Sequence, residues 1–182
     1  KGARKSVKVA LGGDGADEIF GGYVNFQAAQ FASLMALLSK SSGSLLRRLL
    51  DYLPTSDHYM SIKFRLHQLS KGFGYPPILQ NCLWMSAFDE QEKRDLWQSD
   101  IEINDNVKLT FNEILGEAKD ISPQVINSFM LMFKRTYLPN HILTKMDRAS
   151  MYNSLEVRSP MLAKSIEDFS TSIPTSWKVS GF

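Results

Sequence analysis

The sequence predicts a mainly α-helical chain with one short strand of a parallel sheet, followed by a helical bundle, as part of a larger α/β domain. The strand is predicted at residues 7–11, where a short apolar run ends abruptly at Gly12 and Gly13. Apolar residues at helical spacing dominate the remainder, and no second convincing strand follows. Because a buried strand needs neighbours, we expect the rest of the sheet to lie upstream of Lys1.

The elements after the strand follow from caps, breakers and apolar spacing. Gly21 and Gly22 predict a kink, or a close approach of another backbone, within the first helix. Asp89 and Glu92 form a capping-box pattern, and Pro139 predicts a helix break. The expected helices are residues 15–38, 45–53, 57–69, 89–97, 107–118, 125–137, 141–152 and 162–172, with loops at 39–44 and 99–106 and a bend or linker at 73–84.

Composition places the chain among ordinary globular proteins and excludes several classes. Hydrophobic residues make up 43% and charged residues 22% of the 182 positions. A net charge of +2 does not favour a nucleic-acid or membrane partner, and no apolar run is long enough to span a bilayer. The single cysteine, Cys82, excludes an internal disulfide and is expected in the core. With no signal peptide, a cytoplasmic location is expected.

The first candidate site is the turn after the strand, where glycines precede three acids. Backbone N–H groups at Gly12 and Gly13 are suited to a phosphate, and the carboxylates of Asp14, Asp17 and Glu18 to a hard cation such as Mg²⁺. Ligands of α/β proteins bind at this end of the strands. The alternative is structural: an acid caps the helix and Gly15 relieves backbone strain.

The second candidate site lies at residues 136–161, where charges cluster in an otherwise apolar stretch. Lys145, Asp147 and Arg148 fall within one helical turn, and Arg158 lies two residues before a proline, in a segment expected to be extended. A guanidinium there is suited to binding a carboxylate or phosphate. Alternatively, Asp147–Arg148 and Glu156–Arg158 are structural ion pairs.

Together the two stretches resemble a known family. LGGDGADEIFGGY (residues 11–23) and LTKMDRASMYNSLEVRSPML (residues 143–162) resemble two motifs of the synthetase domain of the glutamine-hydrolysing asparagine synthetases and their relatives, the asparagine synthase family. The resemblance implies that residues 1–182 are part of an adenine nucleotide α hydrolase-like (ATP-pyrophosphatase) domain. It also implies that the pyrophosphate-binding SGGxDS loop and an N-terminal glutaminase domain lie outside the sequence, so that the 182-residue chain is expected to be inactive by itself.

The family's chemistry is ATP-dependent amidation of a carboxylate through an acyl-adenylate, with AMP and pyrophosphate released. The resemblance implies ATP and Mg²⁺ as cofactors, aspartate as the carboxylate and glutamine-derived ammonia as the nitrogen donor. The implied roles are metal binding by Asp17, catalysis by Asp14, nucleotide binding by Gly12 and Gly13, and substrate binding by Lys145, Asp147, Arg148 and Arg158.

Some features leave alternatives open. Gly12 stands where the family commonly has Ser or Thr, and Asn140 and His141 replace an acidic position that holds the ammonium group of aspartate. A relative acting on another carboxylate, such as a sugar acid or a β-amino acid, and a non-catalytic helical interaction domain are therefore the other hypotheses. The sequence does not decide the oligomeric state, and a homodimer is compatible with it.

Overall fold

The computed structural model describes residues 2–54, 61–88, 90–97, 113, 116 and 125–179. These residues are mostly helical, as predicted, with one small parallel sheet. The chain forms two compact units: unit 1 consists of Lys1–Gln27 and Gly116–Phe182, and unit 2 of Ala28–Leu115. Both candidate sites belong to unit 1. No helix in the described ranges is long and apolar enough to cross a bilayer.

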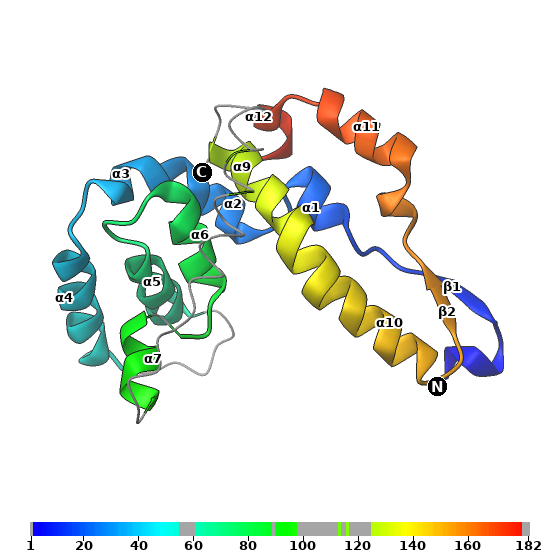
Figure 1. Ribbon diagram of the computed structural model, residues 1–182, viewed down its shortest axis with the longest axis horizontal. Coiled ribbons are helices and arrows are strands. Elements are labelled where there is room, and N and C mark those ends of the chain that lie inside the picture. Colours follow the sequence, from blue (N-terminus) through cyan, green and yellow to red (C-terminus); the bar gives the residue numbers. More distant parts are fainter. Residues whose placement is uncertain are drawn as a thin grey trace. The chain divides into compact units, whose positions relative to one another are not determined.

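The sheet consists of two short parallel strands, β1 (Val9–Leu11) and β2 (Glu156–Arg158), which lie side by side in Figure 1. Val9 pairs with Glu156, and Leu11 with Arg158. The prediction that no second strand follows is therefore wrong, because β2 has only three residues and its charged ends give no apolar run. Leu11 is also 73% exposed, so β1 is not the buried strand that its sequence predicts.

The remaining elements of unit 1 are helical. They are η1 (Ala3–Lys5), α1 (Ala16–Phe20), α2 (Val24–Ala28, whose last residue belongs to unit 2), α9 (Val125–Met132), the π-helix η3 (Phe133–Leu143), α10 (Thr144–Met151), η4 (Pro160–Leu162), α11 (Lys164–Ser172) and α12 (Thr175–Lys178). The last long helix thus starts within two residues of its expected position.

The long first helix of the sequence prediction is broken into shorter pieces. Helix α1 ends at Gly21, which has a left-handed backbone (φ 77°) and donates its N–H to the carbonyl of Asp17 at 2.9 Å. A Cβ at Gly21 would lie 2.6 Å from a side-chain carbon of Val179 and 3.4 Å from the backbone oxygen of Lys178, so another stretch of backbone does come close to the first of the two glycines. After α2 the chain continues as η2 (Ala29–Phe31) and α3 (Ala32–Ala36).

Elements α9, η3 and α10 form one continuous helical rod, which is the diagonal yellow-to-orange element in Figure 1. The helix break predicted at Pro139 does not occur, because this proline lies within the π-helix. An α-helix would press the proline ring against the carbonyl four residues earlier, and the wider π turn accommodates the ring. The hydroxyl of Thr144 donates to the carbonyl of Pro139 at 2.8 Å.

Unit 2 also contains α4 (Lys40–Asp51), α5 (Ile62–Lys71), α6 (Pro77–Met85) and α7 (Glu90–Leu96). The loop predicted at 39–44 is instead the start of α4, because Ser39 caps the helix by accepting the N–H of Ser42 at 3.1 Å. The linker predicted at 73–84 contains α6, which tolerates Pro77 in its first turn. The loop expected at 99–106, the cap at Asp89 and most of the helix at 107–118 lie outside the described residues.

Each unit has its own core. In unit 1 the rings of Phe26 and Phe133 are buried with centroids 5.0 Å apart. In unit 2 the buried Gln80 donates to the carbonyls of Ala32 and Tyr75 at 2.7 and 2.8 Å. Cys82 is half-buried in α6 rather than fully in the core, and burial raises the pKa of its thiol to about 12.

Candidate functional site

The parallel pairing of β1 and β2 brings the two candidate stretches together. Both strands end at the same edge of the sheet, and the N–H of Gly12 donates to the carbonyl of Arg158 at 2.9 Å. The backbone of Gly12 and Gly13 therefore lies beside Arg158, although 146 positions separate Gly12 from Arg158 in the sequence. Ligands bind at this edge in parallel sheets, so the geometry supports a site here.

The glycines of the turn differ in what surrounds them. A Cβ at Gly12 would lie 2.8 Å from Oδ2 of Asp14 and 3.3 Å from Val157, so only glycine fits there without a shift. Gly13 has no neighbour within 4 Å of the position of a Cβ and is exposed. A ligand can therefore approach the backbone at Gly13, whereas Gly12 holds the turn against the sheet.

Gly15 is the N-cap of α1, with φ 93° and no side-chain cap. A Cβ there would lie 2.2 Å from Leu162 of η4, so glycine is required for both its backbone and its contact. The structural hypothesis is thus correct for Gly15. It does not hold for Asp14 and Asp17 as cap residues, because no side chain caps this helix.

The two acids occupy different surroundings. Oδ2 of Asp14 is buried and has no hydrogen-bond partner among the described residues. A buried, unpartnered carboxylate oxygen is costly, and a ligand or cation at the turn would relieve this cost. Asp17 is exposed in the first turn of α1. A Cβ at Gly22 would lie only 2.0 Å from Oδ1 of Asp17. Gly22 therefore leaves the room that the Asp17 side chain occupies.

The third acid of the cluster, Glu18, is buried and pairs with Tyr23, which the sequence did not predict. Glu18 is 1% exposed and accepts the phenol O–H of Tyr23 at 2.8 Å. Burial, followed by the hydrogen bond to Glu18, raises the pKa of Tyr23. The ring of Tyr23 packs 4.9 Å from that of Phe133. An acid followed five positions later by tyrosine, across Gly21-Gly22, was the only signal in the sequence.

The charges of α10 lie near the sheet but not in the turn. Helix α10 packs against β2, and Lys145, Asp147 and Arg148 are all exposed on it. Within the described part of the chain, no hydrogen bond or ion pair joins their side chains to Asp14 or Asp17. The proposed Asp147–Arg148 ion pair is likewise not formed there. The tertiary structure thus brings Arg158 to the glycine–acid turn and leaves the other three residues outside direct contact.

Arg158 forms an ion pair with Glu156, in which Nε lies 2.7 Å from Oε1. Their side chains are 68% and 52% exposed. The expected Glu156–Arg158 ion pair is therefore formed. Since solvent screens such a pair, it holds the guanidinium weakly, and the guanidinium stays accessible at the edge of the sheet.

The acidic position of the family motif is occupied differently. Asn140 and His141 are exposed in η3, and the His141 ring stacks on Tyr137 with centroids 4.9 Å apart and planes inclined by 14°. Tyr137 in turn meets Phe133 edge-on at 5.5 Å. His141 is thus held by a row of aromatic rings along one side of η3.

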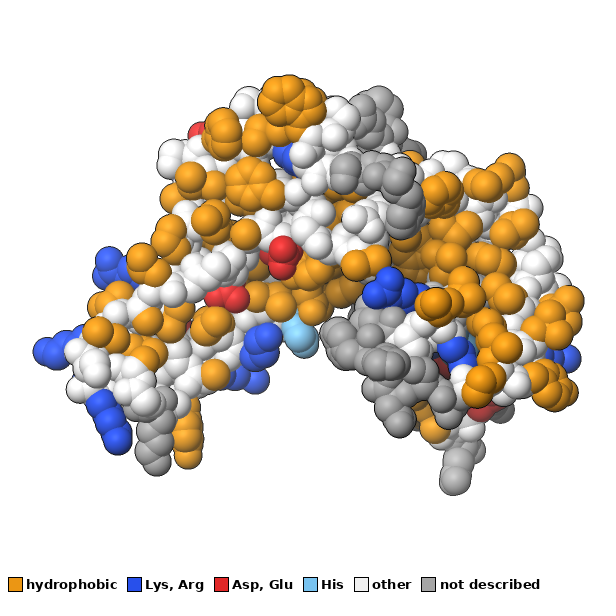
Figure 2. All heavy atoms as spheres, turned by 180° about the vertical axis from the view of Figure 1, so that it is seen from behind, with side chains coloured by type: hydrophobic (Ala, Val, Ile, Leu, Met, Phe, Trp, Pro, Cys, Tyr) orange, Lys and Arg blue, Asp and Glu red, His pale blue; other side chains and the backbone are white. Residues whose placement is uncertain are grey.

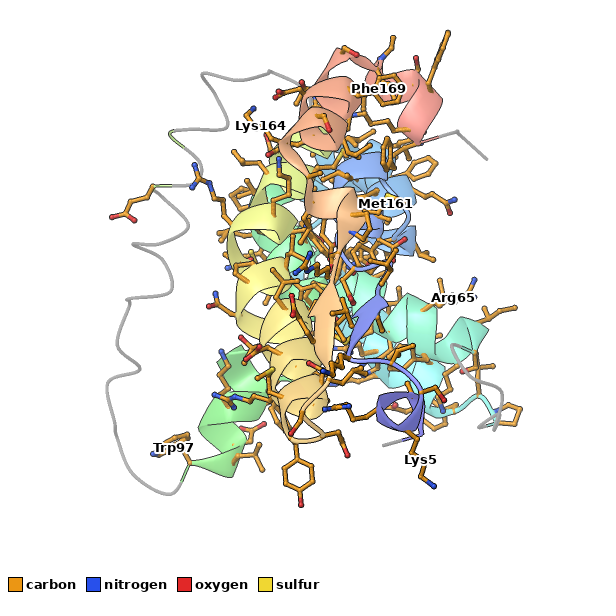
Figure 3. The ribbon with its side chains drawn as sticks, turned by 90° about the vertical axis from the view of Figure 1, so that its right-hand side faces the viewer. Lys5, Arg65, Trp97, Met161, Lys164 and Phe169 are labelled. Carbon is orange, nitrogen blue, oxygen red and sulfur yellow. The ribbon has the colours of Figure 1, made fainter. Side chains whose placement is uncertain are left out.

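A cavity of about 180 Å³ lies behind the turn in unit 1. Apolar residues make up most of its lining, with an ion pair between Lys134 and Glu167 at its side. The hydrogen bond from Lys134 lowers the pKa of Glu167. Figure 3 shows Met161, one of the lining residues, just beyond the carboxyl end of β2. The full lining is Ile19, Lys134, Leu138, Met161, Leu162 and Glu167.

A hard cation fits the turn only in part. Within the described residues, no group of three or more His, Cys, Asp or Glu side chains could hold a metal ion. Asp14 and Asp17 nevertheless supply carboxylate oxygens on one turn. Mg²⁺ usually takes one or two protein carboxylates and completes its coordination with phosphate oxygens and water. The donor set is thus suited to a cation that arrives with a phosphate ligand.

The fold and the candidate site therefore define a mostly helical chain whose glycine–acid turn lies at the carboxyl end of two parallel strands. The chain belongs to the asparagine synthase family, because the family model described as "Asparagine synthase" matches residues 1–181.

Curated relatives agree with the family. Asparagine synthetase [glutamine-hydrolyzing] 1 of Bacillus subtilis is 28% identical over 182 residues, which cover 98% of this chain and 27% of the relative. Proteins of Mycobacterium bovis and Mycobacterium tuberculosis, whose names carry the same assignment provisionally, are 28% identical over 180 residues, or 98% of this chain and 26% of each relative. The chain thus spans about a quarter of the length of these relatives. No solved structure matches the chain significantly.

Proposed function

We propose that the polypeptide carrying this chain catalyses ATP-dependent amidation of a carboxylate, and that the chain supplies part of an ATP-pyrophosphatase domain. In this reaction a carboxylate oxygen attacks the α-phosphorus of ATP, and the bond to the departing pyrophosphate breaks. Ammonia then attacks the acyl carbon of the acyl-adenylate, loses a proton and displaces AMP. Membership of the asparagine synthase family supports the reaction class.

The observation that carries the proposal is the position of the glycine–acid turn at the edge of the sheet beside Arg158. The open backbone at Gly13 is suited to a nucleotide phosphate, and the accessible Arg158 guanidinium to a phosphate or carboxylate. Two groups that both suit an anionic ligand thus come from distant parts of the chain to one edge, where Gly12 donates its N–H to the carbonyl of Arg158.

Each acid has a separate role in the proposal. Asp17 would hold Mg²⁺, which when bound neutralises the charge that builds up on pyrophosphate. Asp14, with its unpartnered carboxylate oxygen, would accept a hydrogen bond or a proton from ammonia as the amide forms. Lys145, Asp147 and Arg148 stay assigned to substrate binding, from the exposed face of α10.

For the substrate, we propose aspartate, with ammonia derived from glutamine in an N-terminal glutaminase domain. The names of the relatives, which state asparagine synthetase and glutamine hydrolysis, support this choice. A second candidate is a different carboxylate. His141, stacked on Tyr137, favours it, because an imidazole does not offer the permanent negative charge that pairs with the ammonium group of aspartate.

The deciding experiment measures AMP and pyrophosphate release by the full-length gene product with ATP, Mg²⁺ and glutamine, with and without aspartate. Aspartate-dependent release together with asparagine formation is the expected result. ATP binding without a response to aspartate would support the second carboxylate. Failure to bind ATP at all would contradict the proposal and favour a non-catalytic helical interaction domain.

The metal assignment is tested in the same protein by Asp17→Asn. The variant is expected to need a higher Mg²⁺ concentration for half-maximal pyrophosphate release and to have a lower kcat. Asp168→Asn, which changes an exposed acid of α11, is the matched control and is expected to behave as the unchanged protein. An Asp17→Asn enzyme with an unaltered Mg²⁺ dependence would show that the metal is held elsewhere.

A further inference from the structure

Helix α4 of unit 2 has two apolar faces, of which only one is covered. Gly43 and Leu50 face the interior: a Cβ at Gly43 would lie 2.5 Å from the carbonyl of Ser70 on α5, and Leu50 is 4% exposed. Leu45, Leu49 and Tyr52 are 59%, 57% and 89% exposed. Their spacing of four and three positions places them along one side of the helix. They form an apolar stripe, which we call the Leu45–Tyr52 stripe.

The surroundings of the stripe are strongly basic. Without Lys71, which is buried, helices α4 and α5 together carry five Lys and Arg residues against the single acid Asp51, a net charge of +4, whereas the whole chain has +2. Arg48 lies next to the stripe, one position before Leu49, and is exposed. Figure 3 shows Arg65 projecting from α5. Figure 2 shows hydrophobic side chains interspersed with Lys and Arg over the surface of this unit.

We propose that the Leu45–Tyr52 stripe and its basic border dock an acidic amphipathic helix of a partner protein. A single row of apolar residues, three to four positions apart, has the width of one helix–helix seam. Acidic residues beside the apolar row of the partner would meet Arg48 and the other exposed cations of α4 and α5, and opposite charges across the border specify the partner. This surface belongs to unit 2, so the proposal is independent of the reaction assigned to unit 1.

Two other occupants fit the surface less well. A second copy of the chain in a two-fold dimer would place the same patch on both sides, and its cations would face each other. An anionic membrane favours a helix with a broad apolar face buried in the interface. In α4 the side that carries Gly43 and Leu50 is already covered within the unit, and the exposed stripe is only one row wide.

The test uses a fluorescein-labelled helical peptide of about 18 residues, with leucines three and four positions apart and glutamates on both sides of them. Its matched partner has lysines in place of the glutamates. Fluorescence anisotropy with the full-length gene product is expected to show binding of the glutamate peptide only. Binding should weaken between about 50 mM and about 500 mM NaCl, because the charges at the border are exposed.

Variants then locate the binding surface. Leu45→Ser combined with Leu49→Ser is expected to weaken binding about tenfold or more, because the apolar row carries the contact. Leu96→Ser, which changes a leucine of α7 that is 63% exposed, is the control and should leave binding unchanged. Arg48→Glu should weaken binding of the glutamate peptide and strengthen binding of the lysine peptide. Circular dichroism confirms that each variant is folded.

Several outcomes would overturn the proposal. These are equal binding of both peptides, no binding of either, or binding that the Leu45→Ser, Leu49→Ser double variant leaves intact. Concentration-dependent dimerisation that the double variant abolishes would identify a second copy as the occupant. Co-sedimentation with phosphatidylserine vesicles, lost in the same variant, would identify a membrane surface.

Discussion

At the scale of single residues, the site depends on a few positions where side-chain size or charge is decisive. Gly12 and Gly15 allow the turn to pack against the ends of β2 and η4, and Gly22 leaves room for Asp17. Asp14 has a buried carboxylate oxygen without a hydrogen-bond partner among the described residues. Arg158 has only an exposed ion-pair partner, Glu156. The polar side chains assigned to chemistry thus have few strong partners within the protein, whereas the glycines are fixed by close packing.

Replacing Gly15 tests the packing of the turn. Gly15→Ala should lower the free energy of unfolding by about 1–3 kcal/mol, because alanine resists the positive φ and its Cβ would overlap Leu162. Urea unfolding followed by circular dichroism measures the change. Gly13→Ala is the control, since nothing lies within 4 Å of its added carbon, and it should be close to neutral. Equal losses in both variants would contradict the contact with Leu162.

Arg158 is assigned to the substrate rather than to stability, and two variants separate these roles. Arg158→Gln should change the free energy of unfolding by no more than about 1 kcal/mol, because its ion pair with Glu156 is exposed. In the full-length gene product the same variant should raise KM or lower kcat. Glu156→Gln breaks the same ion pair but keeps the guanidinium, and should retain activity. If both variants behave alike in the kinetic assay, the pair is structural.

At the scale of elements, local signals predicted helices better than the breaks between them. Pro139 lies inside a helical rod because the π turn accommodates it, and the serine-rich start of α4 is a helix because Ser39 caps it. Proline and serine are ambiguous signals, since each is unfavourable within a regular helix and favourable near its start. Strand β2, with three residues, gave no periodic signal that a sequence pattern could detect.

The cap of α4 offers a direct test of this interpretation. Ser39→Ala removes the acceptor for the N–H of Ser42 and should destabilise unit 2 by about 1 kcal/mol. Ser41→Ala, at an exposed position in the first turn, should be neutral or slightly stabilising, because alanine has the highest helix propensity. Thermal and urea unfolding measure both. An unchanged Ser39→Ala protein would mean that the cap contributes nothing to the stability of α4.

At the scale of the whole molecule, buried and half-buried charges make stability depend on pH. Lys71 is 5% exposed and donates to Glu92 of α7 at 2.9 Å. His67, on the same helix as Lys71, is half-buried. Its pKa lies below the usual 6.5, first because of burial and then because of the nearby cations Lys71 and Arg47. Glu92 and Asp51 oppose this shift without cancelling it.

The lowered pKa of His67 predicts that the protein loses stability on acidification at pH values above those at which carboxylates titrate. The unfolded chain takes up a proton near pH 6.5, whereas folded His67 resists it, so unfolding is favoured as the pH falls below that value. The free energy of unfolding should therefore be level between about pH 7 and about pH 8 and decline towards about pH 5.5. His67→Gln should flatten this part of the profile. A decline of equal size in that variant would assign it to other groups.

The sequence by itself determined the family, the strand at its start, most of the helices and the two stretches that make the candidate site. These follow from local order: a short apolar run, helical spacing, and glycine, proline and acid side chains within a few positions of one another. The 3.6-residue period and the cap residues act over one or two turns, so a local pattern suffices to predict them.

Only the tertiary structure decided which distant residues meet. The parallel pairing of β1 with β2 placed Arg158 beside Gly12. The packing of α1 against η3 accompanies the burial of Glu18 beside Tyr23, and Lys145 and Arg148 lie on an exposed helix face. Each of these depends on which backbone and ring surfaces pack against one another. Contacts between residues far apart in the chain are set by the packing of whole elements, and no short stretch of sequence contains that information.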